Sequence, residues 1–236
     1  MFMFIDPMYF LFALPGVLFA MWAQWRVKSA FAEGSRIAPA SGASGAQAAD
    51  QILRSAGIDG AQIEPTDGYL TDNYDPREKI LRLSPDVYSG RSLSAVGVAA
   101  HECGHAIQDS VHYPLLGLRN ALVPVASFGS NIAIPLMLIG FLLSYAGMFF
   151  GAWLIYGGIA LFAVATIFQI VTLPVEFDAS RRARIALREN GLVTQVEDET
   201  VAKVLHAAAL TYVAGALSSI LILAYYVFRS GALNRD

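Results

Sequence analysis

The longest uncharged stretch of this sequence is NALVPVASFGSNIAIPLMLIGFLLSYAGMFFGAWLIYGGIALFAVATIFQIVTLPV, residues 120–175, between Arg119 and Glu176. A membrane-spanning helix needs about 20 apolar residues, so this stretch predicts a hairpin of two spans within residues 121–175. Ser144-Tyr145-Ala146-Gly147 is the expected tight turn between them. Because two crossings return the chain to the side that it left, the residues before and after the hairpin are expected on one side of the membrane.

Composition and two further apolar segments also indicate a membrane protein. Of the 236 residues, 56% are hydrophobic and 15% are charged, whereas soluble domains have about 25% charged residues. Residues 7–25 predict a transmembrane anchor that is retained, since no basic residue precedes them and Trp22 and Trp25 resemble an interfacial belt. Residues 204–228 predict a fourth span. The net charge of −3 gives no support for nucleic-acid binding, and a single cysteine excludes an internal disulfide.

Residues 26–119 form a polar insert that is predicted to be membrane-proximal and to carry the catalytic chemistry. The insert contains His101-Glu102-Cys103-Gly104-His105, on a helix expected at about 93–108. Imidazoles four positions apart on a helix share one face and can hold one Zn²⁺. Glu102 is then the expected general base of a hydrolase. Cys103 points to another face of the helix; as a fourth ligand it would indicate a structural zinc instead.

A catalytic zinc site commonly has three protein ligands, so a third ligand must come from elsewhere in the chain. Glu176 opens a third-ligand region at 176–203 and falls on the same side as the motif, because it directly follows the two-span hairpin. Alternatively, Glu176 only marks the membrane boundary and pairs with the arginines after it. His112 is expected at the surface. His206 and Tyr212 are candidate oxyanion donors, although Tyr212 is also a residue type that packs between spans.

The rest of the insert is expected to hold a helix at 46–56 and short strands at 58–64, 68–71 and 79–83, with a turn at 72–76. The last strand is either scaffold or an edge strand that offers backbone groups to an extended peptide. The predicted fold class is therefore a mainly α membrane protein. It has about four transmembrane helices and a small α+β, zincin-like catalytic insert.

Three segments together resemble the YugP-type neutral zinc metallopeptidases, which are bacterial membrane proteins: AAHECGHAIQ at 99–108, LTDNYDP at 70–76 and EFDAS at 176–180. The likeness extends from about Pro7 to Phe228. It implies a membrane-bound zinc peptidase with His101, His105 and Glu176 as ligands and Glu102 as the catalytic residue.

The chain is more distantly similar to the HtpX-type and CAAX-prenyl endopeptidases, which place an aspartate four positions after the ligand glutamate. Ser180 stands at that position here, and an acid occurs instead at Asp178. Asp178 is therefore only a candidate for the contact that would orient a zinc-binding histidine.

The sequence predicts a zinc-dependent endopeptidase in the bacterial cytoplasmic (inner) membrane, acting on peptide or protein substrates that can include membrane proteins. Lys and Arg near the span ends favour a cytoplasmic active site with both termini outside. The alternative is a non-catalytic membrane scaffold that is stabilised by zinc. An intramembrane protease of the site-2 type would carry the histidine motif within a span, and a zinc transporter would carry ionisable ligands there; the sequence has neither feature.

Overall fold

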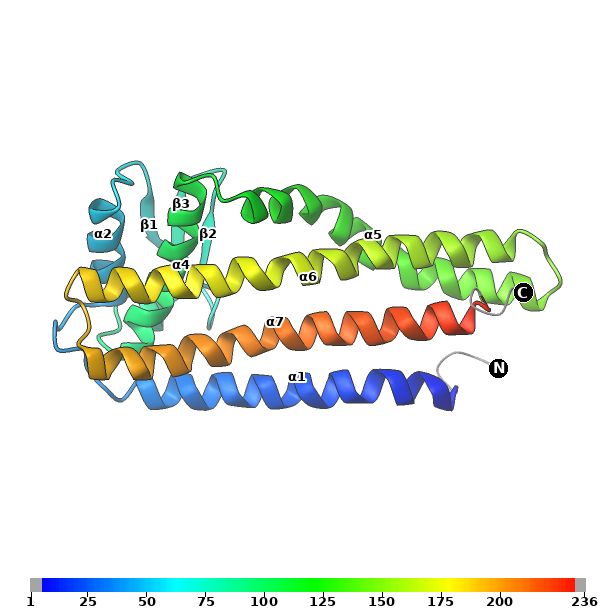
Figure 1. Cartoon of the computed structure of the whole chain (residues 1–236), viewed down its shortest axis with the longest axis horizontal. Helices are drawn as coiled ribbons and strands as arrows, with labels where there is room; N and C mark the ends of the chain where they lie inside the picture. The colour runs from blue at the N-terminus through cyan, green and yellow to red at the C-terminus, as the bar shows by residue number, and fades with distance from the viewer. Residues whose placement is uncertain (1–5, 232–236) are drawn as a thin grey trace. The chain divides into compact units, whose positions relative to one another are not determined.

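The computed structural model describes residues 6–231, and within them it has seven helices and three short strands (Figure 1). In chain order the elements are α1 (Pro7–Gly34), α2 (Gly45–Ser55), β1 (Gln62–Pro65), β2 (Asn73–Asp75), β3 (Ile80–Leu83), α3 (Pro85–Tyr88), α4 (Leu93–Ser110), α5 (Pro114–Tyr145), α6 (Gly151–Glu189) and α7 (Gln195–Arg229). The prediction of a mainly helical protein with a small β component is therefore confirmed.

Four helices, α1, α5, α6 and α7, are long and apolar enough to cross a membrane, which confirms the predicted number of spans. Helices α5 and α6 are joined after Tyr145 by a turn in which Gly147 has a φ of 78°, as expected for a tight connection. Helices α6 and α7, with 39 and 35 residues, are longer than a single span requires. Their surplus turns carry the charged segments 176–189 and 195–203.

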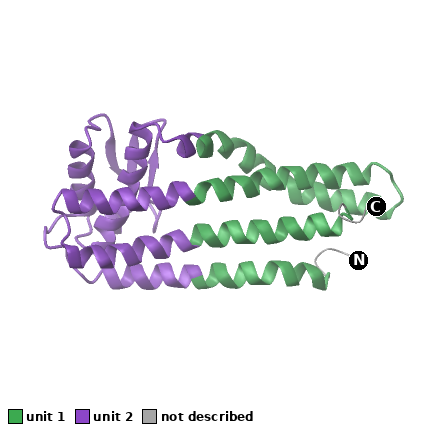
Figure 2. Cartoon of the chain, in the orientation of Figure 1, with its two compact units in different colours: residues 1–22, 118–173, 211–236 green, residues 23–117, 174–210 purple. Residues whose placement is uncertain are grey.

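The chain divides into two compact units (Figure 2). Unit 1 comprises residues 1–22, 118–173 and 211–236, and unit 2 comprises residues 23–117 and 174–210. The core of unit 1 is formed by Ala133, Met137, Phe162, Tyr225 and Tyr226. Within this unit α5 and α6 pack closely: a Cβ added at Gly158 of α6 would lie only 2.9 Å from the carbonyl oxygen of Ala133 on α5. Small residues at such contacts are typical of helix packing in membranes.

Unit 2 packs α2, α3, α4 and the sheet around one hydrophobic core. Ile52 of α2, Leu81 of β3, Val96 of α4 and Leu187 of α6 are fully buried in it. Helix α4 begins after Ser92, whose hydroxyl accepts a hydrogen bond from the backbone N–H of Ala95. The core therefore fixes α4 and the charged end of α6 in one body.

The sheet has the strand order β1-β3-β2, with β1 parallel and β2 antiparallel to β3. The prediction of a strand at 68–71 was wrong: Gly68 and Leu70 have φ values of 109° and 55°, which no strand adopts. The strand β2 lies instead at 73–75, within the expected turn, where Tyr74 is paired with Leu81. The hydroxyl of Tyr74 also donates a hydrogen bond to Asp109 at the end of α4 (2.9 Å).

Candidate metal centre

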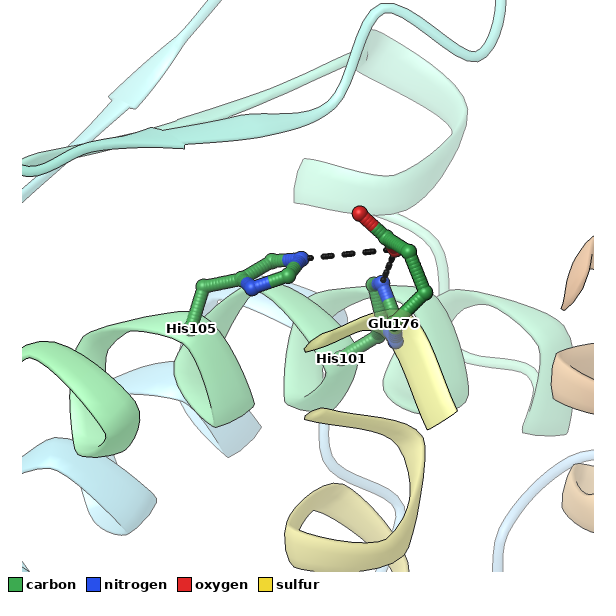
Figure 3. A group of neighbouring side chains, drawn as sticks. All are labelled: His101, His105 and Glu176. Atoms are coloured by element: carbon green, nitrogen blue, oxygen red, sulfur yellow. Dashed lines mark hydrogen bonds and ion pairs between the residues drawn. The ribbon is translucent and has the colours of Figure 1, made fainter. Parts of the chain in front are cut away.

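Three side chains from two helices of unit 2 meet at one point (Figure 3). The Nε2 atoms of His101 and His105 on α4 lie 3.2 and 3.5 Å from the same oxygen, Oε2 of Glu176 on α6. The ligand atoms that the three residues offer all lie within 4.8 Å of one another. One ion between the three side chains could therefore contact all of them.

A close approach of the two backbones brings Glu176 to the histidines. A Cβ at Gly104, between the histidines, would lie 2.3 Å from the carbonyl oxygen of Ala179. Only glycine leaves room for the α6 backbone at this point of α4. Ala179 and Ala183, one turn apart on α6, are fully buried, and their small side chains allow the two helices to approach closely. The glycine in the motif thus has a packing role that bears directly on the site.

Gln108 orients His105 and links it to α6. The Oε1 atom of Gln108 lies 3.0 Å from Nδ1 of His105. The Nε2 atom of Gln108 donates hydrogen bonds to the carbonyl oxygen of Val175 (2.8 Å) and to Asp178 (3.0 Å). Because the amide nitrogen of Gln108 makes both of these donations, its amide oxygen accepts the hydrogen bond from Nδ1–H of His105. The lone pair of Nε2 of His105 is then available to a metal.

Ser180 makes the equivalent contact to the other histidine. Its Oγ lies 3.1 Å from Nδ1 of His101, so the residue that replaces the aspartate of the distant families still touches a histidine of the motif. Within residues 6–231, Asp178 has no hydrogen bond to either histidine. It binds Gln108, Arg181 and Arg182 instead. Asp178 therefore acts on His105 only through Gln108.

Glu102, next to His101 in the motif, is buried, with 8% of its surface exposed. The pKa of its carboxyl is raised to about 7, chiefly by burial. The charge of His101 opposes this rise in pKa, and the charges of Glu176 and Asp72 add to it. The backbone N–H of Tyr74 on β2 interacts with the carboxylate. Glu102 thus lies between α4 and the edge strand of the sheet.

Glu176 and Cys103 have different environments. Burial raises the pKa of Glu176, but its hydrogen bonds to His101 and His105 outweigh burial and hold the pKa well below its usual range. Cys103 is fully buried in the core, where its Sγ lies 3.7 Å from the carbonyl oxygen of Ala49 on α2 and burial raises its pKa. Cys103 therefore faces away from the histidines and offers no thiolate to them.

Among the described residues, His112 and His206 are not part of the three-residue group. His112 is exposed and has a φ of 52°, as a residue in the turn between α4 and α5. His206 is exposed on α7 and lines a groove together with Ser180. Tyr212 lies on α7 in unit 1, so its role as an oxyanion donor stays a prediction.

The donor set fits zinc. Two imidazole nitrogens and one carboxylate oxygen are a common ligand set of catalytic zinc sites, which keep a fourth position open. Both Nδ1 atoms are held by other residues, so both Nε2 atoms point inward as metal-bound histidines do. Glu176 would supply the carboxylate oxygen of this set.

Gln108 was not among the residues expected to shape the site. Gln108 lies three positions after His105 on the same helix, a spacing that places the two side chains together; this spacing could have identified it. A glycine at position 104 is compatible with close packing, but Ala179 is 75 positions away, and the local sequence does not identify it as the partner.

Comparison with known proteins identifies the family of the chain. A family model described as "Putative neutral zinc metallopeptidase" matches residues 9–231. The chain is also similar to a protein of Bacillus subtilis (strain 168) named "Putative membrane protease YugP". The two are 46% identical over 209 residues, which cover 88% of this chain and 90% of that protein. No solved structure matches the chain significantly. The chain is thus a membrane protein that belongs to the neutral zinc metallopeptidase family of the YugP type, as its sequence motifs predicted.

Proposed function

We propose that this protein is a zinc-dependent endopeptidase in which His101, His105 and Glu176 hold one Zn²⁺ and Glu102 is the general base. The observation that carries the proposal is that both inward Nε2 atoms face one ionised carboxylate oxygen, within 3.5 Å. A zinc ion, when bound, supplies the Lewis-acid chemistry that acidifies water and polarises a carbonyl group. Family membership supports the choice of zinc.

Glu102 transfers the proton in this mechanism. Its carboxylate accepts a proton from the attacking water, whose oxygen forms a bond to the carbonyl carbon of the scissile peptide. When the C–N bond breaks, Glu102 delivers that proton to the departing amine. Ser180 and Gln108 hold His101 and His105 in their orientation. The two histidines would thereby fix the position of the zinc and of a carbonyl group beside it.

The strand β2 is the proposed support for the substrate backbone. It is an outer strand of the sheet, and the backbone N–H of its Tyr74 lies at the carboxylate of Glu102. An extended peptide added along such an edge places a peptide bond beside the metal centre. This proposal accounts for a protein or peptide substrate without specifying its sequence.

The membrane is proposed to be the bacterial cytoplasmic membrane, with the active site on the cytoplasmic side. The charged ends of α6 and α7 contain Arg181, Arg182, Arg184, Arg188 and Lys203, and such residues favour the cytoplasmic side. A cysteine introduced at either terminus, labelled in intact cells with an impermeant reagent, tests this orientation. The native Cys103 is buried and provides a low background. Labelling of the termini only after lysis would contradict the proposal.

The substitution Glu102→Gln tests the mechanism. It keeps the size of the side chain and removes the base, so peptidase turnover is expected to fall by about a hundredfold to ten-thousandfold. Zinc content should stay at one ion per chain, because Glu102 is not a proposed ligand. Undiminished turnover would exclude Glu102 as the base. The alternative function, a zinc-stabilised scaffold without catalysis, predicts bound zinc and no turnover in the native protein as well.

The same variant offers a route to the substrate. In cells that contain only Glu102→Gln, an uncleaved substrate is expected to accumulate in the membrane fraction, and quantitative proteomics against wild-type cells would identify it. An unchanged membrane proteome in conditions where the wild-type protein is produced would favour the scaffold function.

A further inference from the structure

A groove of about 450 Å³ lies between α6 and α7 within unit 2. Its polar lining consists of one serine, three arginines and one histidine: Ser180, Arg181, Arg184, Arg188 and His206. Phe177 and Leu205 contribute apolar surface. The lining residues include no carboxylate, so the groove offers cationic donors beside an apolar wall.

Two carboxylates position the arginines without neutralising the group. Asp198, which is 2% exposed, accepts hydrogen bonds from Nε and Nη2 of Arg184 (3.0 and 2.7 Å) and lies 3.8 Å from Arg188. Asp178 pairs with Arg181 and with the neighbouring Arg182. Four guanidinium groups thus share two carboxylates. Each guanidinium has five N–H donors, so donors remain for a further anion, and arginine is well suited to phosphate.

The groove occurs where both helices leave their apolar segments. Phe177 lies two residues after the uncharged stretch that ends at Val175, and His206 directly precedes the uncharged stretch 207–228 of α7. Phe177 is 45% exposed. At the end of a span, cationic side chains beside exposed apolar surface lie at the depth of lipid headgroups.

The groove is separate from the site where a peptide would be cleaved. Ser180 lines the groove and contacts Nδ1 of His101, whereas Nε2 of His101 faces Glu176. The groove therefore adjoins the back of the imidazole, on the side away from the proposed metal. A ligand there does not occupy the substrate position beside Glu102 and β2.

We propose that this groove binds the phosphate headgroup of an anionic phospholipid. The arginines contact the phosphate, and the acyl chains pack against the exposed side chain of Phe177. The proposal depends on the protein being in a membrane and does not depend on its peptidase activity.

Native mass spectrometry of the full-length, zinc-loaded protein in detergent tests the proposal by titration with phosphatidylglycerol. The test variant carries Arg181→Gln and Arg188→Gln; Arg184 is kept because it pairs with the buried Asp198. Since a basic residue near an anionic headgroup contributes about fivefold in affinity, phosphatidylglycerol binding should weaken by about fivefold to twentyfold. Arg54→Gln is the matched control: Arg54 is an exposed arginine in an ion pair with Asp50 on α2, and its removal should leave lipid affinity unchanged.

Titrations with two other compounds identify which part of the lipid is bound. Phosphatidylcholine and glycerol 3-phosphate should both bind at least tenfold more weakly than phosphatidylglycerol, because the former has no net negative charge and the latter has no acyl chains. Equal binding of glycerol 3-phosphate would make the ligand a soluble phosphate, and displacement of the lipid by an acidic peptide would make the groove a peptide site. Unchanged phosphatidylglycerol affinity in the double variant would also overturn the proposal. If the double variant loses zinc, Arg181→Gln alone, at a side chain that is 64% exposed, carries the same test.

Discussion

The substitution Gly104→Ala should damage the metal centre although it touches no ligand. The added Cβ would lie 2.3 Å from the carbonyl oxygen of Ala179, so α4 and α6 must separate by about 1 Å to reach an ordinary C···O contact of about 3.3 Å. Metal–ligand distances tolerate only about 0.2 Å. Because Glu176 comes from α6 and both histidines come from α4, the separation is transmitted directly to the three donors.

The expected result is a zinc affinity that falls by about tenfold to hundredfold, comparable to the loss of an outer hydrogen bond to a ligand. Overpacking costs about 1–3 kcal/mol, and alanine regains about 1 kcal/mol through its higher helix propensity. The free energy of unfolding should therefore fall by up to about 2 kcal/mol. Competition with a chromogenic chelator measures the first effect, and thermal unfolding in detergent measures the second.

Two other glycines provide matched controls. A Cβ at Gly97, on the same helix, would lie 3.2 Å from a methyl group of Val201, which can move by a few tenths of an ångström. A Cβ at Gly117 would meet nothing within 4 Å. Both alanine variants should bind zinc like the wild type. Wild-type zinc affinity in Gly104→Ala would refute the idea that this backbone contact sets the position of Glu176.

Two further substitutions test the surroundings of the site, and a third tests the stability of the fold. Gln108→Ala should weaken zinc binding by about tenfold to hundredfold, since His105 loses its Nδ1 partner and α4 loses its link to α6; unchanged binding in the chelator assay would exclude this role. Ser180→Ala removes one hydrogen bond to His101 and should weaken zinc binding by about tenfold, with wild-type affinity as the contrary result. Glu197→Ala should cost about 1 kcal/mol of stability at pH 7, because Glu197 accepts hydrogen bonds from the backbone N–H groups of Ala40 and Thr194 (2.7 Å each). Although burial raises the pKa of Glu197, these bonds lower it below 4.5; their contribution is therefore present above pH 4.5 and lost as the pH falls through the lower folded-state value. Thermal unfolding at neutral and acid pH should show the difference disappear in acid, and a constant difference would contradict the assignment.

The membrane spans could be predicted from the sequence because their signal is local. An uncharged run of residues 120–175 and a run at 207–228 are visible without any structure, and burial of such runs in a bilayer needs no specific partner. The meeting of Glu176 with the two histidines could be anticipated from the fixed spacing of the motif and from the even number of crossings between them. That reasoning predicts only that the three residues lie on the same side of the membrane. Their contact depends on the packing of α4 against α6 in unit 2.

The remaining features of the site depend on contacts that are distant in sequence. The edge strand β2 lies within an apparent turn cluster, and it is held by pairing of Tyr74 with Leu81 and by the hydrogen bond to Asp109. Such pairing outweighs the turn preference of Asn73 and Asp75. Likewise, Asp178 was a candidate partner of a histidine, but Gln108 takes that contact and Asp178 binds Gln108. Which of two neighbouring polar residues reaches a histidine depends on side-chain geometry that a sequence pattern does not contain.

Anomalous diffraction at the zinc edge from crystals of the full-length protein tests the central claim most directly. We expect one zinc peak per chain, at about 2.0–2.2 Å from Nε2 of His101, Nε2 of His105 and a carboxylate oxygen of Glu176. Cys103 should lie outside the coordination sphere, and the carboxylate of Glu102 should not be a ligand. A zinc peak bound by Cys103, or one that leaves Glu176 uncoordinated, would contradict the account.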